Sequence, residues 1–211
     1  MHAIKALGTV VESLLGVLGF KPVESLVVVA VKGGEVGCVM RLDLSDAVMA
    51  DAPDRLAELA VRSGADGVVA VVVSAEGAGC RMCGDQFGDL ARDLSAALGR
   101  HGAQLFDAVV VDRIEAGGRW HCVDGCGLAG VLDDPATSAA AAAAVAAGHR
   151  MYGTREELAA SVAVDLERAA AVAPLLADAG GLVDDVAVSV REVVAAVRRV
   201  GDQQVEAGDE I

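Results

Sequence analysis

The stretch that decides the fold is SLVVVAVKGGEVGCVMRLDL, which runs from Ser25 to Leu44. Its first part, residues 25–32, is a β-branched apolar run that predicts a strand. Gly33 and Gly34 follow at once, and a glycine pair between two apolar runs is typical of a tight hairpin turn. We therefore expect residues 36–44 to return as the second strand of an antiparallel hairpin.

Two further strands are expected after the hairpin, each preceded by a helix. The strands are residues 67–74 and 105–114, and the first is almost entirely apolar, as in a strand that is buried on both faces. The helices are expected over 46–63 and 85–100, with Pro53 tolerated only near a break or in a new first turn. Alternation of strand and helix favours parallel pairing through right-handed crossovers.

A second hairpin is expected at the other end of this region. Residues 115–118 form its turn and 119–122 its short return strand, while a helix is expected over 9–18 at the start of the chain. The sequence thus predicts an α/β fold. Its mixed, mostly parallel sheet is flanked by helices and carries antiparallel hairpin strands at its ends.

The character of the chain changes after Asp133-Asp134-Pro135, which predicts an α/β domain over 1–135 and a helical extension packed on it over 136–211. Residues 137–147 are mostly alanine, and Thr154 to Glu157 form a capping box that opens another helix. We expect the acidic tail to be frayed. A valine seam at spacings of three and four predicts a surface for a protein partner or for a homodimer; its members are Val183, Val186, Val190, Val193, Val197 and Val200.

Composition excludes several classes of function. The chain has 211 residues and a net charge of −14, which argues against nucleic acid as a partner because phosphate binding needs a basic surface. The sequence contains no long uncharged apolar span, so we expect no membrane helix. The N-terminus does not resemble a signal peptide. Five cysteines, an odd number, favour free thiols and a cytoplasmic location.

Three stretches resemble the actinobacterial family DUF4192, a family of unknown function. The first is LGFKPVESLVVV with the Arg-x-Asp-Leu that follows it, within residues 14–44. The second is GGRWHCVDGCG, Gly117 to Gly127, and the third is AAGHRMYGTREELAASVAVD, Ala146 to Asp165. In the family the loop around Cys122 is longer and rich in Cys and Pro, whereas here it is short and Cys126 keeps the second thiol. The resemblance implies a fold and no catalytic residue.

The carboxyl edge of the sheet is the first candidate site. If strands 36–44, 67–74 and 105–114 run in one direction, their ends meet at one edge, where ligands bind in open α/β sheets. Arg41 and Asp43 alternate and so share a face of their strand. Such a cluster would anchor a small polar ligand or a cation, and the alternative is an ion-paired strand end. The candidate ligand-binding residues are Glu24, Ser25, Arg41, Asp43, Asp112 and Arg113, with Ser74 and Glu76 beside them.

The cysteines are the second candidate. Cys80 and Cys83 have the C-x-x-C spacing at the start of a helix, which favours a thiolate, but no proline precedes the next strand as in a thioredoxin-like site. With Cys122 and Cys126 they would supply four thiolates for a structural zinc. Strand rise places Cys122 about 13 Å from the loop edge, so the loop after Ser74 would have to fold down to it. Reduced, unpaired cysteines are the alternative.

Neither candidate identifies an activity. Histidines are few, and no nucleotide-binding or nucleophile-elbow motif follows a strand. The sequence favours a non-catalytic binding or regulatory module that uses the carboxyl edge of its sheet. A hydrolase or transferase acting on a small polar substrate at that edge is the alternative, and a thiol redox protein comes third. Cys38, inside a strand, is expected to be a small core residue.

Overall fold

The computed structural model describes residues 2–178, and it describes side chains at 7–80 and 84–175. By its internal contacts the chain divides into two compact units, 1–158 and 159–211. The valine seam and the acidic tail lie outside the described residues. No helix within the described part of the chain is both long and apolar enough to cross a membrane.

The elements follow one another in an order close to that expected from the sequence. The strands are β1 (Ser25–Lys32), β2 (Glu35–Asp43), β3 (Gly67–Val73), β4 (Gln104–Val111), β5 (Arg119–Cys122) and β6 (Ala129–Val131). The α-helices are α1 (His2–Leu18), α2 (Leu44–Ala47), α3 (Ala52–Arg62), α4 (Arg81–Arg100), α5 (Ala139–Ala146), α6 (Arg155–Ser161) and α7 (Leu166–Asp178). Two 3-10 turns, η1 (Gly77–Gly79) and η2 (Pro135–Thr137), complete the described part.

The six strands form one mixed sheet in the order β2-β1-β3-β4-β5-β6. The prediction of a mostly parallel sheet is wrong, because β3 and β4 form the one parallel pair of the described sheet. The reason is that β1 pairs with both β2 and β3 and so separates them. Six consecutive residues of β1 are buried, whereas the first four of β2 are exposed. The more apolar strand of the hairpin therefore takes the interior position.

The predicted convergence of strand ends is nevertheless confirmed. Because β1 runs antiparallel to both neighbours, β2 and β3 point the same way, and β4 runs parallel to β3. Ser25 lies opposite both Asp43 and Val73, and Val73 lies opposite Val111. The carboxyl ends of β2, β3 and β4 thus share an edge with the start of β1. Strand β6 is an addition that the sequence did not indicate, because three residues carry little periodicity.

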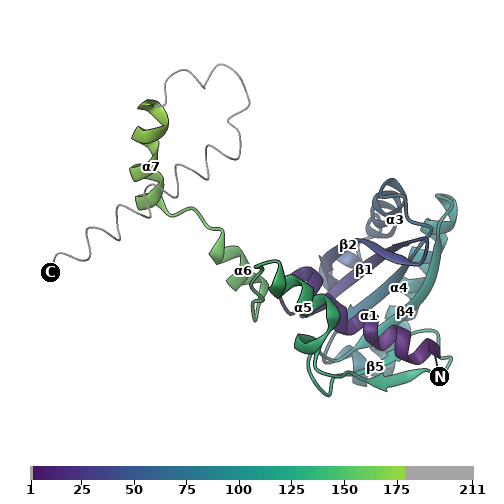
Figure 1. Ribbon diagram of the computed structural model, residues 1–211. Helices are drawn as coiled ribbons and strands as arrows, with labels where there is room; N and C mark the ends of the chain where they lie inside the picture. Colours follow the sequence, from purple (N-terminus) through teal and green to yellow (C-terminus); the bar gives the residue numbers. More distant parts are fainter. Residues whose placement is uncertain (1, 179–211) are drawn as a thin grey trace. The chain divides into compact units, whose positions relative to one another are not determined.

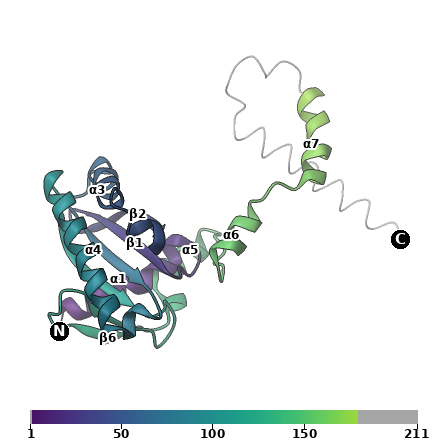
Figure 2. The same ribbon diagram turned by 180° about the vertical axis from the view of Figure 1, so that it is seen from behind.

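Helices cover both faces of the sheet in the unit that ends at residue 158. On one face the core combines β-strand side chains with α1 (Figure 1) and includes Val11, Val27 and Trp120. On the other face α3 and α4 lie over the strands (Figure 2), and the core includes Leu56, Leu94 and Val28. Successive residues of β1 therefore enter different cores, as the two-residue period of a strand requires.

Two local expectations change in the structure. The helix expected over 46–63 is split into α2 and α3, and Pro53 stands in the first turn of α3, where its missing N–H leaves no bond unmade. Cys38 is exposed, so its assignment to the core is wrong. It lies on β2, an edge strand, where the register with β1 shifts between Val29 and Val31 and the first four residues of β2 are exposed.

Helix α5 packs against α1 at a point where no side chain fits between them. A Cβ placed on Gly16 of α1 would lie 2.3 Å from the Ala141 nitrogen of α5. Ala141 is fully buried there. The Ala141 N–H donates a hydrogen bond to the Ser138 hydroxyl oxygen at 3.2 Å, and this cap fixes the start of α5. An alanine helix with little apolar bulk is thus held by close backbone approach, and it belongs to the same compact unit as the sheet.

We predict that Gly16→Ala destabilises the protein by about 1–3 kcal/mol, the usual cost of overpacking. Gly8→Ala on the same helix is the matched control, because its Cβ would meet Trp120 at an ordinary 3.6 Å. Gly8→Ala should therefore stabilise the protein by up to about 1 kcal/mol, because alanine has a higher helix propensity than glycine. Urea unfolding of the two variants measures the difference, and equal stabilisation by both would contradict the packing of α5 on α1.

Candidate functional site

The hairpin that joins β5 to β6 gathers two thiols and a carboxylate. Cys122 ends β5, and Cys126 returns toward it through a loop in which Gly125 and Gly127 have φ angles of 73° and 82°. Such left-handed conformations favour glycine. The Cys126 N–H donates to Asp124 Oδ1 at 2.9 Å, which tightens the turn. As a result the ligand atoms of Cys122, Asp124 and Cys126 all lie within 4.8 Å of one another.

The members of this cluster differ in burial and charge. Cys122 is buried and its thiol donates to Asp107 Oδ1 at 3.4 Å, whereas Asp124 and Cys126 are exposed. Burial raises the pKa of the Cys122 thiol, and the hydrogen bond with Cys126 and the nearby Asp107 carboxylate raise it further. The Cys126 backbone N–H lowers the pKa of Asp124. The metal-free cluster thus favours a protonated Cys122 thiol beside an ionised Asp124 carboxylate.

The donor set is suited to a metal ion. Two sulfurs and one carboxylate oxygen are ligands for zinc and for other thiophilic divalent ions. The sequence indicated Cys122 and Cys126 for such a role but not Asp124, although C-x-D-x-C in a short glycine-bounded loop was a usable signal. Cys80 is half-buried and does not belong to the group. The side chain of Cys83 lies outside the described residues, so the four-thiolate site stays a prediction.

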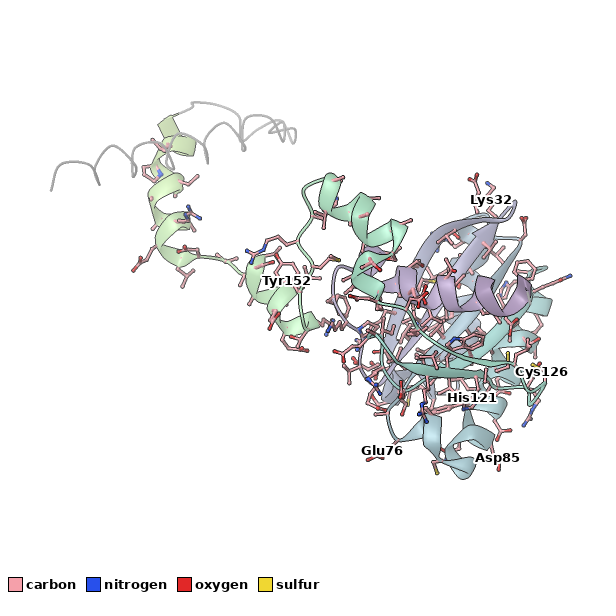
Figure 3. The ribbon with its side chains drawn as sticks, turned by 60° about the horizontal axis from the view of Figure 1, so that its bottom comes forward. Lys32, Glu76, Asp85, His121, Cys126 and Tyr152 are labelled. Atoms are coloured by element: carbon pink, nitrogen blue, oxygen red, sulfur yellow. The ribbon has the colours of Figure 1, made fainter. Side chains whose placement is uncertain are left out.

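A cavity of about 350 Å³ adjoins the cluster, and Cys80, which the sequence also indicated as a metal ligand, lines it. Cys122 lines it as well, together with His121, Asp85 and Gly125. His121 Nε2 lies 3.3 Å from the Ala78 carbonyl oxygen, and Nδ1 lies 3.1 Å from that of Cys122. The loop after Ser74 therefore does fold onto β5, as a metal shared with Cys80 would require. Figure 3 shows His121, Asp85 and Cys126 at one end of the sheet.

A larger groove, about 880 Å³, runs on another side of the cluster, between α4 and the β4–β5 region. Asp107, Asp124 and Cys126 line it from the sheet side. Gly84 and Gly88 line it from α4, and a Cβ at either position would meet nothing within 4 Å. The exposed members of the cluster therefore border an open space that ligands or partners can enter.

At the carboxyl edge of the sheet the predicted residues bond to one another. Arg41 donates to Ser25 Oγ at 2.9 Å and pairs with Asp43 at 2.7 Å, while Glu24 accepts from the Ala75 N–H at 3.2 Å. Glu24 has a φ of 40°, the one positive value among the described non-glycine residues. Arg41, Ser25 and Asp43 thus form a network between β1 and β2, and Glu24 separately bonds the loop after β3.

Asp112 and Arg113, from the end of β4, form a second group. They pair with each other at 2.8 Å, and Asp112 also accepts from the Arg119 N–H at 2.8 Å, which closes the β4–β5 turn. Ser74 is buried and accepts from the Gly77 N–H at 3.0 Å, whereas Glu76 is exposed (Figure 3). These contacts pair the polar groups of the edge within the protein, and the role of the edge in ligand binding stays a prediction.

Fold and site together define a class: a mixed-sheet α/β protein with helices on both faces and a thiol–carboxylate cluster in a hairpin loop. A family model described as "Domain of unknown function (DUF4192)" matches residues 8–210, and the chain belongs to this family. The resemblance seen in the three sequence stretches is thereby confirmed. No curated protein and no solved structure matches the chain significantly.

One ion pair at this edge gives a pH-dependent prediction. Lys21 donates to Glu115 Oε1 at 2.7 Å, and this hydrogen bond lowers the pKa of Glu115 below its ordinary 4.5. A carboxyl whose pKa is lower in the folded state stabilises the fold above its unfolded pKa, and the contribution is lost as pH falls through the folded value. Because both side chains are about half exposed, we expect only about 0.2–1 kcal/mol.

Glu115→Gln should therefore lower stability slightly at pH 7, and the difference from the unmodified protein should vanish once the pH falls well below 4.5. Urea unfolding across this pH range measures it. Glu156→Gln, on α6 and without a described ion pair to Lys21, is the control. A difference that grows toward acid would contradict the assignment.

Proposed function

We propose that this protein is a non-catalytic zinc-binding module whose ion is held by Cys122, Asp124 and Cys126. The observation that carries the proposal is the mutual distance of the three donors, all within 4.8 Å in one short loop. Zinc is held by sulfur, imidazole and carboxylate ligands, and it takes four ligands in most protein sites. The cluster supplies three of them without any rearrangement of the strands.

A cation could take the place of the proton that the Cys122 thiol holds in the metal-free cluster. Two thiolates and the Asp124 carboxylate would place three negative charges together, with Asp107 only 3.4 Å from the Cys122 sulfur. Like charges at such distances repel strongly where one of them is buried. A divalent ion neutralises most of this charge, and thiolates select zinc over magnesium or calcium.

The proposed role of the ion is to fix the hairpin and to present the loop. Strand β6 has three residues, and a hairpin so short gains little from its own ladder. A metal that ties Cys122 on β5 to Cys126 in the loop would give this end of the sheet a defined surface. Such a site needs reduced thiols, so we place the protein in a reducing compartment such as the cytoplasm, and we propose neither nucleic acid nor membrane as its partner.

The carboxyl edge is the second candidate, for binding a small polar ligand or, as an enzyme, for hydrolysis or group transfer. The observation in its favour is Glu24, whose strained backbone stands where three strands end. Against it stands the network of Arg41, Ser25 and Asp43, which uses these polar groups on one another. We therefore favour the hairpin cluster, whose donors bond to one another and to Asp107 and have no bond to a basic side chain among the described residues.

We predict that protein purified under reducing conditions and loaded with zinc retains about one ion per chain. Cys126→Ser and Asp124→Asn should each lower the zinc affinity by at least about tenfold. Changes to residues that only support a ligand already lower metal affinity by about tenfold to 100-fold. Metal analysis after dialysis and competition with a chromogenic chelator measure the affinity. Thiol titration of loaded against metal-free protein should show two of the five cysteines protected.

Cys38→Ser is the matched control, because Cys38 is an exposed cysteine on β2 that lies outside the cluster. It should leave zinc affinity unchanged and lower the total thiol count by one. Five reactive thiols and no retained metal would contradict the proposal. Protection of four thiols, lost in both Cys80→Ser and Cys83→Ser, would replace this site with the four-thiolate one.

A further inference from the structure

We infer that the ion keeps one coordination position open toward the groove beside α4, and that this position binds a neutral or cationic ligand with a thiol or imidazole donor. The inference rests on the proposed zinc site and adds a ligand class to it. Three features carry it: the one-sided origin of the donors, the shape of the opposite wall, and the charge of the groove.

The three donors approach the ion from one loop only. They span residues 122–126, and Asp124 and Cys126 are exposed. Four-coordinate zinc with three protein ligands retains a position for an added ligand, which is the pattern of open rather than closed zinc sites. Here the exposed members Asp124 and Cys126 line the groove, so the open position faces that space.

The opposite wall does not close the site. Gly84 and Gly88 of α4 project no side chain into the groove, and a Cβ at either would still find open space. Among the described residues, Cys126 is the one cysteine or histidine that lines this groove. Asp85 and Asp107 are carboxylates that also line it, and Asp107 accepts from the Ala108 N–H, but neither belongs to the group of donors within 4.8 Å of one another.

The smaller cavity on the other side offers two further donors, and only one could compete. His121 has both ring nitrogens within hydrogen-bond distance of carbonyl oxygens, at 3.1 and 3.3 Å. A ring held in this way is not presented to a metal. Cys80 lines the same cavity as Cys122 and is therefore the protein ligand that could fill the fourth position instead. The experiment below separates these outcomes.

Charge decides which ligands fit. A divalent ion with two thiolates and one carboxylate leaves a net charge of about −1 on the complex, by simple addition of formal charges. The groove adds Asp85, Asp107 and an Asp89–Arg92 ion pair, so its lining is negative overall. Phosphates and carboxylates are repelled from such a site, whereas a ligand that carries an ammonium or guanidinium group beside its sulfur or imidazole is attracted.

The test uses cobalt(II) as a spectroscopic substitute for zinc in the full chain. Its visible bands report coordination, and small thiols are added to the loaded protein: cysteamine, which is cationic, 2-mercaptoethanol, which is neutral, and mercaptoacetate, which is anionic. Each titration is performed at matched thiolate concentration, with metal analysis to verify that cobalt stays bound. We expect spectral saturation in the order cysteamine, mercaptoethanol, mercaptoacetate, with at least a tenfold difference between the first and the last.

Two variants test the parts of the inference. Asp85→Asn changes an exposed groove carboxylate, keeps the metal ligands, and should narrow the preference for cysteamine. Cys80→Ser should leave the cobalt spectrum and all three titrations unchanged. High salt, like Asp85→Asn, should reduce the preference for cysteamine over mercaptoacetate, because salt screens the charges of the groove.

The outcomes distinguish this inference from the proposal on which it rests. No cobalt spectrum at all would remove the metal site itself. A stable cobalt spectrum that no thiol changes, or one that changes in Cys80→Ser, would show a position closed by the protein and would overturn the open site alone. Equal binding of the three thiols, or stripping of cobalt by them, would overturn the assigned ligand class.

Discussion

The constraint on which the structure depends is the burial of β1 on every side. Its residues from Ser25 to Ala30 are all buried, and they contribute to two different cores because neighbouring side chains point to opposite faces. Buried backbone groups must also be paired, so β1 needs a hydrogen-bonded strand along each edge. The hairpin supplies β2 on one side, and β3 takes the other.

This arrangement of the strands determines which charged side chains are paired with one another. With β1 between β2 and β3, the ends of β2, β3 and β4 still meet, and their polar residues pair across the junction. The other half of the sheet has fewer ladder hydrogen bonds, since β5 and β6 are short antiparallel strands. His121 and Cys122 alternate there, so one side chain holds the loop after β3 while the next enters the opposite core.

Part of this could be predicted from the sequence. Both hairpins, most helices and the shared strand edge follow from local patterns of apolar residues and glycines. Strand order does not, because the choice between β1 and β2 as neighbour of β3 depends on comparing the burial of two strands that each look apolar. Cys38 was misplaced for the same reason: its strand pattern is apolar, and only the order of the sheet makes that strand an edge.

The cysteines show a second limit of sequence. Spacing indicated that Cys122 and Cys126 could act together, and it is the turn at Gly125 that brings Asp124 into the same group. Cys80 lies at that end of the sheet on the loop whose Ala78 carbonyl oxygen is 3.3 Å from His121 Nε2. These contacts depend on loop conformation, which local periodicity does not encode.

The two candidate sites differ in how their charges are balanced, and this favours the hairpin. At the carboxyl edge the carboxylates of Glu24, Asp43 and Asp112 each have a guanidinium or an N–H donor, and Arg41 holds Ser25 and Asp43 in one network. A ligand there would have to displace bonds that stabilise the junction of three strands. In the hairpin, Asp107, Asp124 and two thiols gather, and no basic side chain among those described is bonded to them. A cation adds attraction at this cluster without breaking the ladder beneath it, so binding and folding act in the same direction.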